Sequence, residues 1–210
     1  MRAGRGRLCA ADLPREVSVT ARAMLLGLGL LCAAPVMALG MSGTAIAPTY
    51  YYAGYTPTVL NYAASKGGML TQVMGNPFQQ VDRDQLNSEI NGVMARSHFG
   101  PRLPFISKAP ADFASPYRVV LLFDPAQAIT GYQLCTYDGR PAAANPGGTV
   151  RVHAALCANE KPLSSVSGEV GGVASPSDRA FKQLIGQMTV LLFPPRTNPG
   201  GHRNDSEFFS

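Results

Sequence analysis

Two stretches of the chain carry apolar residues at the three- and four-residue spacing of an amphipathic helix. The first follows Asp82, which stands at capping-box distance from Gln85, and it ends before Gly100, because a glycine followed by a proline stops a helix. The second follows Ser175, the predicted cap, with Pro176 at the first helical position. Their buried faces are predicted to contain Leu86, Ile90, Val93 and Met94 in the first helix and Phe181, Leu184, Ile185, Met188 and Leu192 in the second.

A shorter helix and five strands complete the pattern. Thr56 and Pro57 predict the start of the short helix, and Gly67 predicts its end. Residues 117–125 are apolar on both faces, which is typical of a central strand, whereas the more polar residues 162–172 favour a strand at the sheet edge. The other predicted strands are residues 68–75, 131–139 and 149–157, the last two forming a hairpin-like pair around the turn-rich residues 140–148.

The order of these elements is helix, strand, helix, several strands and a final helix, and it indicates an α+β fold. We expect a two-layer sandwich in which the two longer helices lie on one face of a mainly antiparallel sheet. Residues 57–194 are expected to form this single domain. The flanking residues 39–56 predict a flexible, Tyr-rich N-terminal arm, and residues 195–210, rich in turn formers, predict a disordered tail.

Residues 1–38 have the composition of an export signal. The apolar run 23–34 follows a basic region, and Pro35 interrupts it before it reaches the roughly 20 residues that span a bilayer. Small residues place the cleavage site after Ala38, with an alternative after Ala47 that the following proline disfavours. The basic region is long for a signal peptide, so a translation start further downstream is an alternative.

Cys32 lies inside this apolar run and suggests a second interpretation, a lipoprotein signal. In such a signal the acylated cysteine becomes the first mature residue, but Leu31 stands where the lipoprotein peptidase prefers Gly, Ala or Ser. We therefore interpret Cys32 as an apolar residue of the signal, with lipidation as the alternative. The predicted location is exported and periplasmic, and lipidation would add an anchor to the membrane.

Cleavage after Ala38 removes most of the positive charge. The full chain has 18 Lys+Arg and 13 Asp+Glu, of which residues 39–210 keep 13 basic and 11 acidic residues. The net charge of +2 is spread along the chain without a basic run. Nucleic acid is therefore not an expected partner.

Cys135 and Cys157 are the two cysteines that remain after cleavage. An oxidising compartment allows a disulfide between them, which would close a loop of about 22 residues and contribute roughly 3 kcal/mol. Two free buried thiols are the alternative. Neither cysteine belongs to a CxxC motif, so we expect a structural rather than a redox-active role.

Four tyrosines lie close behind the cleavage site, at Tyr50, Tyr51, Tyr52 and Tyr55. Tyrosines on a mobile segment are typical of binding anchors, because each ring offers a large amphipathic surface at little cost in rotamer entropy. They are the candidate partner-binding residues. The alternative is that the rings pack back on the domain as an N-terminal arm.

No residue pattern in the sequence specifies a reaction. The serines of the 162–172 strand lack the glycine that opens a nucleophile elbow, and we interpret them as edge-strand hydroxyls: Ser164, Ser165 and Ser167. The three histidines do not stand at the spacing of paired metal ligands: His98, His153 and His202. The acids are explained as helix-start or turn residues: Asp82, Asp84, Asp124, Asp138 and Asp178. We therefore predict no catalytic, cofactor-binding or metal-binding residue.

Four segments together resemble a family of small exported proteins of proteobacteria, often predicted lipoproteins, whose function is unknown. The segments are "TPTVLNYAASKGGMLTQVMGNPF", "ASPYRVVLLFDP", "RVHAALC" and "SDRAFKQLIGQMTVLLFPP". The resemblance implies an exported location and a common fold, and it brings no activity, cofactor or site residue.

The function that we expect is that of a non-enzymatic protein of the cell envelope. It would bind or scaffold another envelope component, either a protein or the membrane surface, and no small molecule is identifiable as a partner. The first alternative is a periplasmic hydrolase acting on a cell-wall substrate, with a site assembled from scattered acids and His153. The second is a small-ligand-binding module.

Overall fold

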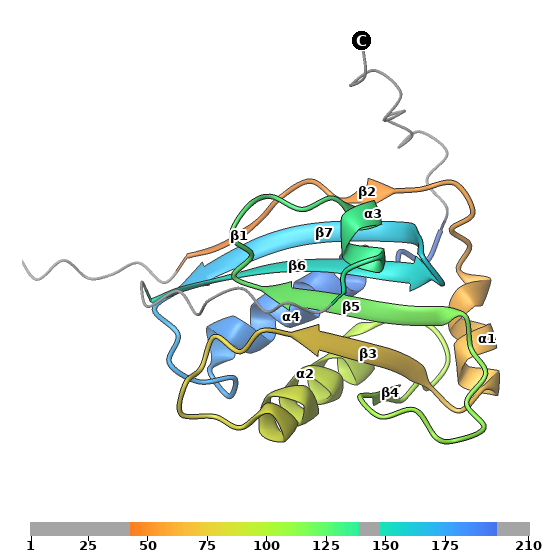
Figure 1. Ribbon diagram of the computed structural model, residues 1–210, viewed down its shortest axis with the longest axis horizontal. Helices are drawn as coiled ribbons and strands as arrows, with labels where there is room; N and C mark the ends of the chain where they lie inside the picture. Colours follow the sequence, from red (N-terminus) through yellow and green to blue (C-terminus); the bar gives the residue numbers. More distant parts are fainter. Residues whose placement is uncertain (1–42, 139–147, 197–210) are drawn as a thin grey trace, which may run out of the picture. The chain divides into compact units, whose positions relative to one another are not determined.

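The computed structural model describes residues 43–138 and 148–196 (Figure 1). The chain divides into two units, Met1–Ala38 and Leu39–Ser210, and every described residue belongs to the second unit. The predicted signal peptide 1–38, Cys32 within it and most of the predicted tail lie outside the described residues.

The described residues form four helices and a seven-stranded mixed sheet, which confirms the α+β class. The helices are α1 (Thr58–Ser65), α2 (Arg83–Ser97), α3 (Gly131–Cys135) and α4 (Arg179–Leu192). The strands are β1 (Thr44–Ile46), β2 (Tyr50–Tyr51), β3 (Met69–Met74), β4 (Phe105–Ile106), β5 (Tyr117–Phe123), β6 (Thr149–Ala158) and β7 (Lys161–Gly171). No helix in this part of the chain has both the length and the apolarity needed to cross a membrane.

The sheet has the order β1-β7-β6-β5-β3-β4, and β2 also pairs with β7. β3 runs parallel to both of its neighbours, β4 and β5, while the other pairs are antiparallel. β5 is a central strand, as its apolar sequence predicted. Its continuous run of apolar residues places side chains in clusters on both faces of the sheet.

The two faces of the sheet bury clusters of different size. The larger cluster contains the apolar stripes of α2 and α4 together with the inward residues of the strands. The smaller one lies on the opposite face, where α3 packs, and consists of Met74, Val120, Leu122, Leu134, Cys135, Ala155 and Cys157. Figure 1 shows α2 and α4 behind the sheet and α3 in front of it. We call this second side the α3 face.

The predicted helix starts are partly right. Asp82 caps α2 by accepting a hydrogen bond from the backbone nitrogen of Gln85 at 2.8 Å, as predicted. The start of the last helix at Ser175 was wrong, because α4 begins after Asp178. The carboxylate of Asp178 accepts bonds from the backbone nitrogens of Ala174 and Ser175, and these bonds hold the preceding residues in a turn.

The strand predicted for residues 131–139 was wrong, because residues 131–135 form the short helix α3. Thr130 and Gln133 make a capping box: each side chain bonds the backbone nitrogen of the other residue. The predicted hairpin partner, β6, pairs with β5 and β7 instead. The turn between the two predicted strands lies largely outside the described residues.

The edge position predicted for residues 162–172 was also wrong. β7 lies between β6 and the N-terminal strands, with Thr44 opposite Val170 and Tyr50 opposite Ser165. Residues 44–51, expected within a flexible arm, are therefore paired with the sheet. The physical reason is that β7 still has a row of free backbone groups on its outer side, which an N-terminal segment rich in Tyr and Ala can satisfy.

Candidate functional site

The four tyrosines behind the predicted cleavage site divide between the two faces of the sheet. Tyr51 and Tyr55 turn toward the end of α4, where their hydroxyls donate to the main-chain oxygens of Leu191 and Pro194 at 2.9 and 2.8 Å. Burial raises the pKa of both hydroxyls, more so for Tyr55, so both remain protonated donors at neutral pH. These two rings fix the N-terminal strands to the C-terminal helix.

Tyr50 and Tyr52 lie on the other side, toward α3. Tyr50 is directly opposite Ser165 in the register, so it shares the α3 face with this residue. The hydroxyl of Tyr52 lies 3.2 Å from the Ser165 hydroxyl, and the Tyr52 ring meets the Tyr132 ring edge to face, with centroids 5.3 Å apart. We call Tyr50, Tyr52 and Tyr132 the tyrosine patch.

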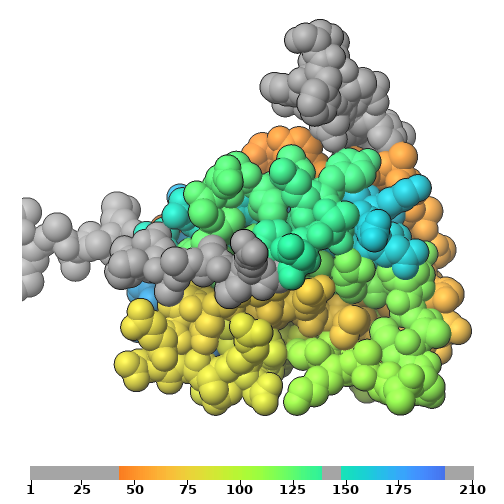
Figure 2. All heavy atoms as spheres, viewed as in Figure 1, coloured from red at the N-terminus to blue at the C-terminus, as the bar shows by residue number. Residues whose placement is uncertain are grey.

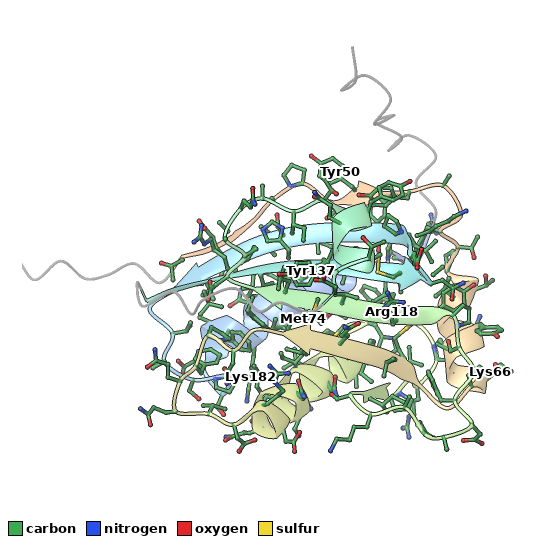
Figure 3. The ribbon with its side chains drawn as sticks, in the orientation of Figure 1. Tyr50, Lys66, Met74, Arg118, Tyr137 and Lys182 are labelled. Carbon is green, nitrogen blue, oxygen red and sulfur yellow. A yellow bond between two sulfur atoms is a disulfide. The ribbon has the colours of Figure 1, made fainter. Side chains whose placement is uncertain are left out.

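Two rings of the tyrosine patch are unusually exposed for aromatic side chains. Tyr50 is 47% exposed and Tyr132 is 54% exposed, although both stand on ordered elements of the fold. In Figure 3, Tyr50 projects at the edge of the molecule beside β2. Exposed rings supported by ordered backbone are a common feature of protein-binding surfaces, because little side-chain entropy is lost when a partner covers them.

The close approach of α3 to Tyr52 depends on Gly131. A Cβ atom at this position would lie 2.6 Å from the Tyr52 hydroxyl oxygen and 3.1 Å from the Ser165 hydroxyl oxygen. A larger residue would therefore require either the Tyr52 side chain or the first turn of α3 to move.

A disulfide and an arginine hold α3 on the sheet. The predicted bond between Cys135 and Cys157 is confirmed, with a Cα–Cα distance of 5.7 Å and both residues almost fully buried. Arg118 donates from its two terminal nitrogens to the main-chain oxygens of Cys135, at 2.6 Å, and Asn159, at 2.8 Å. Figure 2 shows the segment around α3 forming the surface above the strands on this side.

His153, the residue named for a hydrolase, lies on the α3 face between Leu122 of β5 and Ser167 of β7. Burial lowers its pKa, a hydrogen bond with the backbone of Ile129 acts in the opposite direction, and the charge of Arg151 lowers the pKa further. The hydrogen bond with Ile129 links β6 to the segment that precedes α3.

Asp124 directly follows β5 and forms two hydrogen bonds with the backbone of Arg151. Its carboxylate accepts from the backbone nitrogen of Arg151 at 2.9 Å, and its own nitrogen donates to the Arg151 oxygen at the same distance. The residue has a φ of 45°, a conformation that aspartate tolerates better than most residues. Burial raises its pKa, while the hydrogen bond and the charge of Arg151 lower it. These contacts close the end of the strand rather than form a site.

The remaining polar residues named from the sequence do not converge. Ser164 is fully buried, and its hydroxyl donates to the main-chain oxygen of Leu192. His98 is the C-cap residue of α2, and its ring packs on Phe105. Asp138 is exposed. In the described residues no three His, Cys, Asp or Glu side chains gather as a group that could hold a metal ion.

Sequence reasoning missed Tyr132, because it assigned residues 131–139 to a strand. The capping-box spacing of Thr130 and Gln133 is the signal that could have revealed the helix. In a helix starting at Gly131, Tyr132 and Leu134 point to different sides, which leaves Tyr132 exposed while Leu134 is buried.

The chain resembles known proteins only weakly, and only in comparisons of structure. No family model and no curated protein matches the sequence. Among solved structures, a PelC variant dodecamer from Paraburkholderia phytofirmans is 17% identical, with a TM-score of 0.39, over 72% of this chain and 98% of that chain. A second PelC dodecamer from the same organism is 15% identical, with a TM-score of 0.38, over 74% and 99% of the two chains. Similarity at this level assigns neither a family nor an activity.

Proposed function

We propose that the protein is a non-enzymatic component of the cell envelope that binds another envelope protein through the tyrosine patch. The observation that carries the proposal is the exposure of Tyr50 and Tyr132 on the α3 face, where the half-buried Tyr52 contacts the Tyr132 ring and the Ser165 hydroxyl. These rings come from segments 80 residues apart and stand on a sheet and a helix joined by a disulfide.

The surroundings of the patch favour a protein partner. Each tyrosine offers an apolar ring and a hydroxyl, a combination that is enriched in the energetic centres of protein interfaces. The side chains beside Tyr132 on α3 are neutral, and Gln133 and Thr136 already bond within the helix. An uncharged aromatic centre is suited to the desolvated middle of an interface.

The proposed location is the periplasm, after cleavage of residues 1–38. The buried Cys135–Cys157 disulfide is compatible with an oxidising compartment. The resemblance to small exported proteobacterial proteins belongs to the same proposal, as does the alternative of a lipid anchor at Cys32. We propose that the finer architecture is a two-layer sandwich, in which α2 and α4 pack on one face of the sheet. The short helix α3 packs on part of the other face.

Site-specific photocrosslinking in living cells tests this function. A photoreactive residue at position 132 is expected to capture one protein, and Tyr50→Ser in the same chain is expected to reduce that capture. The matched control carries the photoreactive residue at Arg83, an exposed position at the start of α2. Capture of the same proteins from both positions, or of none from position 132, would contradict the proposal.

A further inference from the structure

The Cys135–Cys157 disulfide ties the connection between β5 and β6 to the sheet. This connection spans residues 124–148 and contains α3, and Cys135 lies close to its midpoint, far along the chain from both strands. Cys157 belongs to β6, directly beside β5. The bond therefore fixes the part of the connection that its two flanking strands hold least.

Apart from the disulfide, few contacts attach α3 to the sheet. The helix has five residues, which is too short for a stable helix without packing. Its buried side chains are Leu134 and Cys135, and the guanidinium of Arg118 donates to the Cys135 oxygen. The hydrogen bond between His153 and Ile129 attaches the segment before the helix rather than the helix itself. We therefore expect α3 to leave the sheet when the disulfide is absent.

The rest of the described fold does not depend on this bond. The larger cluster contains neither cysteine and no residue of α3. β2, which carries Tyr50, pairs with β7, and the backbone nitrogen of Tyr52 donates to the Leu163 oxygen. A chain without the disulfide is therefore expected to keep the sheet, α2, α4 and the first two rings of the tyrosine patch.

Tyr132 is the ring that such a chain would lose from the tyrosine patch. It meets Tyr52 edge to face only while α3 is docked, with Gly131 close to the hydroxyls of Tyr52 and Ser165. When α3 leaves the sheet, this contact is broken. The patch would then consist of the rings beside β2, without the most exposed of the three.

We propose that the disulfide is a redox switch for the tyrosine patch, which is complete only in the oxidised chain. This inference rests on the proposed function, because it concerns the regulation of the same surface. When the bond forms, the two thiols lose two electrons and two protons. A donor disulfide, either glutathione disulfide or the disulfide of a thiol oxidoreductase, accepts them and becomes two thiols.

Burial makes this oxidation a single maturation step. Cys135 is 1% exposed and Cys157 is fully buried, and thiol–disulfide exchange requires access to a sulfur atom. Once formed, the bond has the structural role expected from the sequence. The chain completes its binding surface when it meets an oxidising compartment, and it does not bind its partner before then.

Hydrogen exchange measured by mass spectrometry tests the switch without a partner. The oxidised chain of residues 39–210, which form one compact unit, is compared with the variant Cys135→Ala with Cys157→Ala. The amides of Leu134 and Thr136 donate within α3, and in the variant they should lose their protection from exchange. The amides of α2 and α4 should stay protected. Wild-type chain refolded with dithiothreitol should behave like the variant, and glutathione disulfide should restore the protection.

The matched control is Val93→Ala, which weakens the larger cluster and leaves the disulfide intact. It should keep the protection of α3. Protected α3 amides in the double-alanine variant, equal loss in the control, or loss throughout the double-alanine variant would overturn the switch.

Crosslinking in cells links the switch to binding. A photoreactive residue at position 50 is expected to capture the partner in the wild-type background and much less of it in the double-alanine background. Equal capture in the two backgrounds would overturn the switch even if α3 is released. Absence of capture from both position 50 and position 132 of the wild-type chain would instead contradict the proposed function, while the exchange experiment would still decide whether oxidation docks α3.

Discussion

The guanidinium of Arg118 donates a hydrogen bond of 2.6 Å to the main-chain oxygen of Cys135, the last residue of α3. The same Cys135 is bonded to Cys157, which stands directly opposite Arg118 in the β5–β6 register. One arginine thus bridges the helix end and the turn after β6. The position of α3, and with it Tyr132, depends on the disulfide and Arg118 together.

The first prediction concerns the disulfide. Replacing both cysteines by alanine is expected to lower the free energy of unfolding by about 3 kcal/mol, because the unfolded chain is no longer constrained by a loop across 22 positions. Urea unfolding of the two chains measures the difference. The Arg118→Gln variant, with the disulfide intact, should lose less, and an unchanged midpoint in the double-alanine chain would refute the stabilising role.

A second prediction separates the two kinds of N-terminal tyrosine. Tyr51→Phe removes the hydroxyl that donates to the Leu191 oxygen, and it is expected to cost about 1 kcal/mol of unfolding free energy. Tyr50→Phe changes an exposed ring and should leave the stability unchanged. Thermal and urea unfolding of the pair provide the test. Equal stability of the two variants would show that the hydroxyl of Tyr51 does not hold the N-terminal strands.

Asp124 offers a third prediction, because its side chain is needed as an acceptor but its charge is buried. Asp124→Asn keeps the acceptor for the Arg151 nitrogen and tolerates the positive φ, so the free energy of unfolding at pH 7 should be unchanged or higher. Asp124→Ala leaves that nitrogen without its side-chain partner and should cost about 1 to 2 kcal/mol. The two variants are compared in urea at the same pH.

The sign of the Asp124 effect with pH follows from the raised pKa. Burial favours the protonated carboxyl in the folded state, so this residue's contribution to stability falls as the pH rises from the unfolded value through the raised folded value. The difference in stability between the wild type and Asp124→Asn should therefore shift in favour of the asparagine variant over this range. A constant difference would show that the carboxyl is not desolvated.

The fourth prediction is the opposite pH dependence of His153. Burial lowers the folded pKa below the unfolded value of 6.5, so the unfolded chain takes up the proton first as the pH falls. The contribution of His153 is complete above pH 6.5 and is lost between 6.5 and the lower folded pKa. The His153→Gln variant should lose less stability than the wild type between pH 7 and pH 5, and parallel pH curves would contradict this assignment.

The sequence predicted the parts of the fold that depend on strong local patterns. The Asp82 cap predicted the start of α2, the spacing of apolar residues predicted the buried stripe of α4, and a continuous apolar run predicted the central strand β5. The cysteine pair was recognised by elimination, because two cysteines remain after removal of the predicted signal. These features need no knowledge of which segments become neighbours.

The errors arose where pairing between distant segments decides the structure. Residues 162–172 were interpreted as an edge because they are polar, but their hydroxyls meet specific partners: Ser164 bonds the end of α4 and Ser165 contacts Tyr52. The candidate site shows the same limit. Tyr50 and Tyr52 were named from the sequence, whereas Tyr132 joins them only through the packing of α3 on β6 and β7.

The hydroxyls of Tyr51 and Tyr55 reach main-chain oxygens 140 and 139 residues further along the chain. During synthesis the N-terminal strands emerge long before β7 and the end of α4, so they have no partner until nearly the whole domain has left the ribosome. The sheet is completed in a late step that joins the first and last parts of the domain. A chain truncated within the last turn of α4 would keep the pairing of β1 and β2 with β7 but would lose both of these tyrosine hydrogen bonds.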